Sequence, residues 1–377
     1  MNGNVHIGKL FGIKINLHYT WFLVFFLLAW ALSSGYFPER LPGKEAYVYG
    51  ILGALASLLL FASVLLHELS HSLVALKNKI KVSSITLFFF GGVAQVNEDN
   101  FTPNKELKVA IAGPIMSLFL GGLFFALSKF SGVYIGAVFG YLAFVNLILG
   151  GFNLVPGFPL DGGRVLRAIL WKKWGDINRA TYVAAEGGKM FAIFLIIIGV
   201  LGIFFGRIDL WYILLGLFLY SIAKNSYKQT VVSNILKESK VKEYMQTKYK
   251  ALDASMPVSG FDFKKLMSYD QWVYPVLSGK KVIGVALQQQ IEKAKAADGT
   301  RKILEVTIPI HKIKSVSPED TCIKAYELMI MQRIELLPVI ANGKVAGVIK
   351  AATLNELFSM AAVKADAENK AKRKIKQ

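Results

Sequence analysis

The sequence predicts an all-α polytopic membrane domain, with six transmembrane helices and a membrane-associated β-hairpin, followed by a C-terminal α+β cytoplasmic domain. Of the 377 residues, 54% are hydrophobic and 18% are charged, whereas a soluble globular chain carries about 25% charged residues. Long uncharged runs are confined to residues 1–223. The composition excludes a soluble enzyme and a disordered chain, and the single cysteine, Cys322, excludes a disulfide-stapled fold.

The uncharged runs have the lengths of membrane-spanning helices, because a bilayer core of about 30 Å needs about 20 apolar residues. Five of them are long enough, and a sixth segment is shorter but rich in Leu, Ile and Phe. The six predicted spans are 19–36, 46–66, 109–128, 130–160, 190–206 and 210–223. We expect no cleavable signal peptide, since residues 1–18 have mixed composition and no small-residue cleavage site.

Charge predicts the orientation and the further domains. With the N-terminus in the cytoplasm, thirteen Lys and Arg residues near the spans lie inside and four lie outside, so we expect both termini in the cytoplasm. Residues 224–238 are expected to be a linker, 239–362 a soluble domain and 363–377 a basic flexible tail. Lys and Arg outnumber Asp and Glu by 27 to 15 in residues 224–377, which favours contact with anionic lipid over direct nucleic-acid binding.

Three ionisable residues follow the second apolar run, where a charged side chain at membrane depth costs about 2.5–3.5 kcal/mol. His67 and His71 are four residues apart, so on a helix they share a face and can bind one Zn²⁺. Glu68 is close enough to activate a water molecule as a general base without being a ligand. The alternative is a His–Glu pair that bridges two helices, which leaves the second histidine unexplained.

A zinc site of this kind needs a third protein ligand, and Asp161 is the candidate. It ends the fourth uncharged run, in a segment that Pro156 and Pro159 prevent from being helical. Irregular backbone at membrane depth is tolerated only against protein or a wet cavity, so the segment predicts the cavity that a metal needs. The alternative is a cytoplasmic loop aspartate that caps a helix starting near Arg164, and both roles can coexist.

Two motifs carry a family resemblance: HELSH at 67–71 and FNLVPGFPLDGGRVLRA at 152–168. With FFFGGVAQV at 88–96 and AIAGPIMS at 110–117, they resemble the site-2 protease family of intramembrane zinc metalloproteases. The resemblance covers residues 1–223. Six spans with both ends inside are similar to prokaryotic members that carry a cytoplasmic regulatory domain, so we expect a multi-pass protein of a prokaryotic cell membrane.

The resemblance implies that His67, His71 and Asp161 bind one Zn²⁺ per chain and that Glu68 is the catalytic base. It also implies regulated intramembrane proteolysis, in which a peptide bond is cut in or near the transmembrane segment of a substrate. The expected substrate is a single-span membrane protein, such as a membrane-bound transcription regulator or an anti-sigma factor.

Four residues are candidates for substrate binding. Residues 80–97 contain two β-prone segments around Gly91 and Gly92, which predicts a hairpin. Its edge could pair with an unwound substrate, or the hairpin could only pack over the site. Asn146 and Asn153 are seven residues apart on the fourth span and could bond the substrate backbone, or they could hold helices together.

Residues 239–360 contain two weak repeats, each with a helix-like segment, a Pro-Val strand, a short turn and a strand ending in Gly-Val. The second short turn is at 342–344. The pattern is similar to a tandem CBS-domain pair, which implies regulation and an adenine nucleotide as ligand. However, the aspartate that usually contacts ribose aligns near Gln290 in one repeat and Thr353 in the other. A structural role, or dimerisation through this domain, is the alternative.

Two rival functions remain. A CBS-regulated channel or transporter should show inverted repeats or charges along a path, and the sequence shows neither. A catalytically inactive scaffold should have lost site residues, whereas His67, Glu68, His71 and Asp161 are all present. We therefore interpret the chain as an intramembrane zinc metalloendopeptidase.

Overall fold

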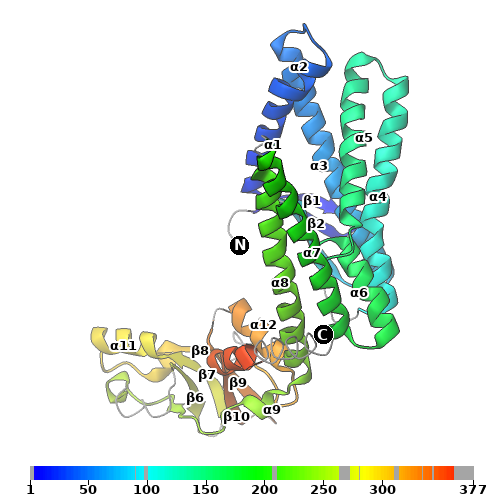
Figure 1. Cartoon of the computed structure of the whole chain (residues 1–377). Coiled ribbons are helices and arrows are strands. Elements are labelled where there is room, and N and C mark those ends of the chain that lie inside the picture. The colour runs from blue at the N-terminus through cyan, green and yellow to red at the C-terminus, as the bar shows by residue number, and fades with distance from the viewer. Residues whose placement is uncertain are drawn as a thin grey trace. The chain divides into compact units, whose positions relative to one another are not determined.

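The structure is a computed structural model that describes residues 4–89, 91–96, 101–205, 210–262, 272–279, 281–309, 314–332, 334–341 and 344–360. The basic tail expected at 363–377 lies outside these ranges, as do 342–343 in the expected second turn. The chain divides into two compact units, Met1–Tyr227 and Lys228–Gln377. Each unit is treated by itself below (Figure 1).

The first unit consists mainly of long helices. Its helices are α1 (Tyr19–Ala31), the short α2 (Phe37–Arg40), α3 (Ala46–Lys77), α4 (Pro103–Phe130), α5 (Val133–Asn153), α6 (Asp161–Trp174), α7 (Ile177–Phe204) and α8 (Leu210–Glu238), which continues into the second unit. A π-helical turn, Leu32–Tyr36, joins α1 to α2. Within the described residues, five segments are long and apolar enough to cross a membrane: Tyr19–Arg40, α3, α4, α5 and α7. The sixth predicted span, 210–223, is the first half of α8.

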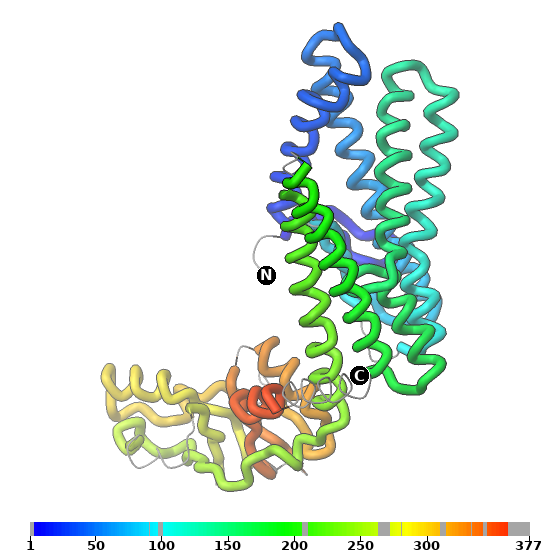
Figure 2. Tube along the Cα trace, viewed as in Figure 1, coloured from blue at the N-terminus to red at the C-terminus, as the bar shows by residue number. Residues whose placement is uncertain are grey.

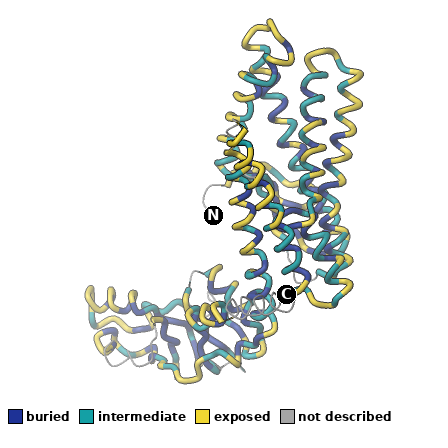
Figure 3. Tube along the Cα trace, viewed as in Figure 1, coloured by how far each residue is buried: buried dark blue, intermediate teal, exposed yellow. Residues whose placement is uncertain are grey.

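Many large apolar side chains of this unit face outward. Phe26, Trp30 and Phe204 are 66%, 69% and 80% exposed, as expected for side chains that contact lipid (Figure 3). The helices α4 and α5 run side by side (Figure 2). At their contact, Leu147 packs on Gly121 and Leu118 packs on Gly150. This reciprocal pairing lets the two backbones approach, which is how membrane helices associate without a hydrophobic driving force.

A four-stranded sheet packs against these helices. Its strands β1 (Asn4–Leu10), β2 (Ile13–His18), β3 (Val82–Phe88) and β4 (Gly91–Val96) lie in sequence order. The hairpin predicted at 80–97 is present as β3 and β4. The hairpin of β1 and β2 was not predicted, although Ile13, Ile15 and Leu17 alternate as in a half-buried strand. The strand β2 is parallel to β3, and its apolar side chains share a core with α3 and α4.

An irregular segment, 154–160, separates α5 from α6. The N–H of Phe158 donates to the carbonyl of Ala184 in α7, at 3.0 Å. A Cβ on Gly188 of α7 would overlap the carbonyl of Phe158, so the two backbones are in direct contact there. The segment is therefore held by α7 just before Asp161, the first residue of α6.

The second unit is α+β. Its elements are α9 (Val241–Tyr244), β5 (Leu252–Asp253), β6 (Val273–Ser278), β7 (Lys281–Leu287), α11 (Gln288–Ala297), β8 (Thr307–Pro309), α12 (Cys322–Gln332), β9 (Leu336–Ala341) and β10 (Lys344–Lys350), with 3₁₀ turns at Val258–Gly260 and Ile303–Val306. The hairpins β6–β7 and β9–β10 coincide with the Pro-Val and Gly-Val segments of the two predicted repeats.

Each half of this unit completes the sheet of the other. The strand β8, which ends at Pro309, where the second predicted repeat starts, pairs with β7 of the first. Gln246, near the start of the first repeat, pairs with Val348 of the second. A Cβ on Gly284 or Gly347 would collide with the backbone of Ile308 or Gln246, respectively. Glycine is therefore required in both Gly-Val pairs, because the crossing strand passes directly over it.

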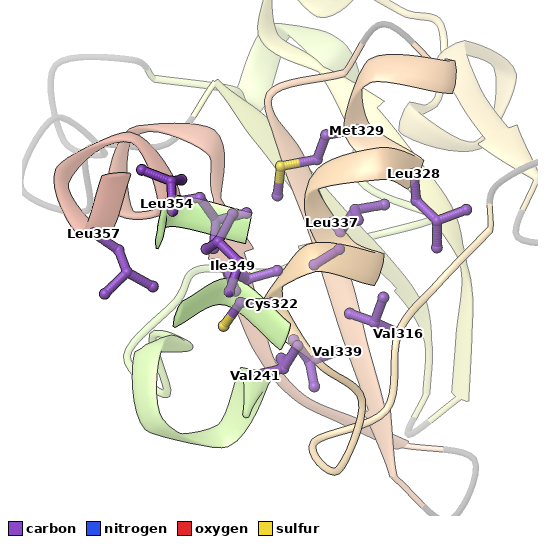
Figure 4. Packing of buried hydrophobic residues seen from close by; sticks show 13 residues of the cluster. Val241, Val316, Cys322, Leu328, Met329, Leu337, Val339, Ile349, Leu354 and Leu357 are labelled. Carbon is purple, nitrogen blue, oxygen red and sulfur yellow. The ribbon is translucent and has the colours of Figure 1, made fainter. Parts of the chain in front are cut away.

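A hydrophobic core joins the two ends of the second unit (Figure 4). Val241 packs there with Cys322, Leu337 and Ile349, and all four are fully buried. Val232 and Leu236 of α8 belong to the same cluster, so the segment 224–238, expected to be a linker, is helical and supplies core residues.

Candidate metal centre

The two histidines of α3 lie on one helix face and are buried to the same extent. His67 and His71 are 5% and 6% exposed, and their ring centroids are 4.9 Å apart. The four-residue spacing places the second ring one turn after the first. The pair is thus shielded from solvent, and its Nε2 atoms lie 3.2 Å from each other.

Asp161 completes the group from a helix ninety residues further along the chain. Its Oδ2 lies 3.2 Å from His67 Nε2 and 3.1 Å from His71 Nε2. As the first residue of α6, the carboxylate also lies where the helix dipole favours negative charge. The helix therefore begins at Asp161 and not near Arg164, and its N-cap is Leu160 with no side-chain cap, so the alternative of a capping aspartate is wrong, while the ligand role stays a prediction. Arg164 Nη1 is 3.9 Å from the other oxygen, Oδ1.

The helix α4 orients both imidazole rings. His71 Nδ1 donates to the Val109 carbonyl at 2.6 Å, and His67 Nδ1 lies 2.8 Å from Ser117 Oγ. Gly113 lies between these residues on the same face, and a Cβ there would overlap Nε2 of both histidines. The three residues recur at intervals of four, so one stripe of α4 supplies a carbonyl, an open space and a hydroxyl.

This arrangement fits a metal ion. A carbonyl can only accept, so the proton of neutral His71 is on Nδ1 and its Nε2 carries a lone pair. His67 Nδ1 faces the Ser117 hydroxyl, which can accept or donate, and its Nε2 converges with His71 Nε2 and one carboxylate oxygen of Asp161. Potential ligand atoms of His67, His71 and Asp161 all lie within 4.8 Å of one another. Two imidazoles and one carboxylate are a donor set that Zn²⁺ accepts.

A cavity of 590 Å³ opens onto this group. It is lined by His67, His71, Asp161, Glu68, Gly91, Gly92, Asn153 and Arg164, and by apolar residues that include Phe152, Leu215 and Phe218. Gly92 is in close contact with Glu68, because a Cβ there would overlap Glu68 Cγ. Glu68 and three of the four predicted substrate-binding residues are thus brought together at the cavity.

Asn146 is the exception. It is fully buried, and its Nδ2 donates to the Leu142 carbonyl at 2.8 Å and to Ser63 Oγ at 3.3 Å. It is not among the described residues that line the cavity. The contact with Ser63 links α5 to α3, which is the helix-to-helix alternative that the sequence left open.

Several residues of the site were missed by sequence reasoning. Val109, Gly113 and Ser117 lie at or beside the AIAGPIMS stretch, which we noted only as family-like. Glu106, which is buried, and Arg167, which is half-buried, form an ion pair between α4 and α6. The two residues are 61 positions apart, so the sequence does not show that they pair. The one signal for them is that each is a charged residue close to an apolar run.

Comparison with known proteins decides the family. The model of "Peptidase family M50" matches residues 55–137 and 130–197, and the "CBS domain" model matches 305–358. The chain is 33% identical over 371 residues to "Zinc metalloprotease MJ0392" of Methanocaldococcus jannaschii, covering 97% of this chain and 98% of that protein. The chain belongs to peptidase family M50. The solved "Site-2 Protease from Methanocaldococcus jannaschii" is 35% identical, with a TM-score of 0.41, covering 59% of this chain and 95% of that one.

Membership of family M50 confirms the resemblance seen in the sequence. The chain is a multi-pass membrane metalloprotease with a CBS domain in its C-terminal part. The M50 match includes both histidines and Asp161.

Proposed function

We propose that this protein is an intramembrane zinc endopeptidase that cuts a peptide bond in or near the transmembrane segment of its substrate. The observation that carries the proposal is the convergence of His67, His71 and Asp161 at a cavity that also contains Glu68. Two buried imidazoles beside a half-buried carboxylate are costly unless they are paired or bind a cation, and the Glu68 carboxylate in the same cavity suits proton transfer.

One Zn²⁺ per chain would be held by His67, His71 and Asp161, and when bound it supplies Lewis-acid activation of water and of the scissile carbonyl. Glu68 accepts the proton of the attacking water and delivers it to the leaving amine. Its contact with Gly92 limits its rotamers and keeps the carboxylate in the cavity. Val109 and Ser117 hold the imidazole rings, and the Val109 carbonyl fixes the tautomer of His71.

Substrate must be unwound before cleavage, because the carbonyls of a helix are already hydrogen-bonded. The strand β4 is the last in its sheet, and Gly91, Gly92, Val93 and Ala94 line the cavity. Its free edge can pair with an extended substrate and replace the lost helical bonds. Asn153, at the end of α5 and on the cavity wall, can bond the remaining backbone groups. These contacts support substrate roles for Gly91, Gly92 and Asn153.

The proposed substrate is a single-span membrane protein, such as a membrane-bound transcription regulator or an anti-sigma factor. The distribution of Lys and Arg supports cytoplasmic termini, and the resemblance to prokaryotic family members is the ground for proposing a prokaryotic cell membrane. The bilayer surrounds the exposed apolar helices, and no direct nucleic-acid partner is proposed.

The CBS-like unit is proposed to regulate the protease. It can do so by binding an adenine nucleotide, although Gln290 and Thr353 occupy the positions where a ribose-binding aspartate is usual, or by dimerisation. Calorimetry of the full chain with ATP and AMP distinguishes these two routes.

Two measurements on purified protein and on cells test the function. Wild type should contain one zinc per chain and His67→Ala should contain none. Cleavage fragments of membrane proteins that are detected in cells with wild type should be absent in cells with Glu68→Gln. This variant should nevertheless keep its zinc. Ser70→Ala is the matched control, because Ser70 is on α3 and its hydroxyl bonds only the Leu66 carbonyl within the described residues. Unchanged fragments with Glu68→Gln refute the proposed base.

A further inference from the structure

An ion pair between a buried glutamate and a half-buried arginine joins α4 to α6 beside the candidate metal centre. Glu106, in the first turn of α4, is 1% exposed. Its Oε1 accepts hydrogen bonds from Nε of Arg167, at 2.7 Å, and from Nη2 of the same guanidinium. Its Oε2 is buried and has no hydrogen-bond partner among the described residues. A buried carboxylate with one unsatisfied oxygen is costly, and a salt bridge of this kind is weak evidence for stability, so the pair is better explained by what it positions than by its contribution to folding.

Arg167 also contacts the irregular segment that precedes α6. Its guanidinium lies 5.1 Å from the centroid of the Phe158 ring. Phe158 is in turn bonded through its N–H to Ala184 of α7. One guanidinium therefore ties α4, the segment 154–160 and α6 together. Asp161 is six residues before Arg167 on α6, about 9 Å along the helix axis.

The same helix, α4, orients the other two candidate ligands. Val109 bonds His71 and Ser117 contacts His67, and Glu106 is only three residues before Val109. The histidines belong to α3 and Asp161 to α6, so the three ligand atoms meet only if both helices are fixed relative to a common element. The helix α4 is that element: it holds α3 through two imidazole contacts and α6 through the guanidinium of Arg167.

We propose that Glu106 and Arg167 are positioning residues that set the separation between the Asp161 carboxylate and the two histidines, and thereby the affinity of the centre for zinc. The inference rests on the proposed zinc function. Nε and Nη2 of one planar guanidinium both donate to Oε1 of Glu106, and this rigid pair of donors fixes orientation as well as distance. Arg167→Lys keeps the charge but loses this geometry, so it should not preserve the zinc affinity of wild type.

The test measures metal binding by the full-length protein in detergent. The zinc dissociation constant is determined by competition with a chelator, and the visible spectrum of the Co²⁺-loaded protein reports the ligand geometry. Loss of a partner that orients a metal ligand typically costs roughly 10–100-fold in affinity, and we expect this for Glu106→Gln. The double variant Glu106→Gln/Arg167→Met leaves no unpaired buried charge. Its zinc affinity should fall by the same factor as that of Glu106→Gln, and not by the product of two separate losses.

The control is Glu186→Gln, which breaks an ion pair of 2.7 Å with Lys189 within α7 and should leave zinc affinity unchanged. The Co²⁺ spectrum should change in the Glu106 variants, as Asp161 leaves its position, and not in the control. Wild-type affinity and an unchanged spectrum in both Glu106 variants, with only a lower unfolding temperature, overturn the inference. Failure of wild type itself to bind one zinc refutes the proposed function instead.

Discussion

Replacing Gly113 by alanine should abolish zinc binding while leaving α4 helical. An added Cβ would overlap Nε2 of both His67 and His71, and zinc–nitrogen bonds are about 2.0–2.1 Å long. The methyl group would therefore occupy the space that an ion between these nitrogens needs. By itself, alanine favours a helix interior by about 1 kcal/mol over glycine. The substitution thus separates the metal site from the stability of the helix.

The magnitude follows from linkage. At a free zinc concentration of about 100 times the dissociation constant, binding stabilises the folded protein by about 2.7 kcal/mol. Wild type should show this as a zinc-dependent rise in unfolding temperature, and Gly113→Ala should show none. Thermal unfolding with and without zinc, together with zinc content after dialysis, measures both effects.

The control for this prediction is Gly122→Ala on the same helix. Gly122 has open space around its Cβ position, so the variant gains the helix propensity and should retain the zinc-dependent shift. One tightly bound zinc per chain in Gly113→Ala would show that the ion does not lie between the two histidines.

Three further predictions concern catalysis and the CBS-like unit. Gly92→Ala should keep zinc but lose about 100-fold in cleavage rate, because the methyl group displaces Glu68; a normal rate refutes the contact. Asn153→Ala should raise KM for a peptide substrate without changing zinc content, and an unchanged KM removes it from the site. Burial raises the pKa of the Cys322 thiol to about 11, so a maleimide should label the folded protein slowly at pH 8. The stabilisation from the protonated thiol should decline as pH rises above about 9, so the stability of wild type relative to Cys322→Ala should fall over that range.

The three side chains of the candidate metal centre could be singled out because ionisable groups are conspicuous in apolar sequence. At membrane depth, His67, His71 and Asp161 had to be paired, hydrated or bound to a metal. The spacing of the histidines and the helix-breaking residues before Asp161 indicated a metal. The surroundings left no such signal. Val109 contributes a backbone carbonyl, which every residue has, and Gly113 contributes the absence of a side chain. Neither can be recognised before the two helices are placed against each other.

Pairings between distant segments were also beyond the sequence. The hairpin β3–β4 was predicted, since its strands are adjacent in the chain. The strand β2 pairs with β3, and Ile15 lies opposite Ile85. This pairing was not predicted, because residues 1–18 were described only by their mixed composition. For Asn146 the sequence offered two roles, and its contact with Ser63 supports the one between helices.

The crossed pairing in the second unit has a consequence for biosynthesis. Gln246 emerges from the ribosome about a hundred residues before its partner Val348, and β7 must wait for β8. Neither repeat can close its sheet by itself, so the nascent unit has unpaired edges until almost the last strand is translated. A stop codon after the first repeat would therefore yield an aggregation-prone fragment rather than half of a regulator.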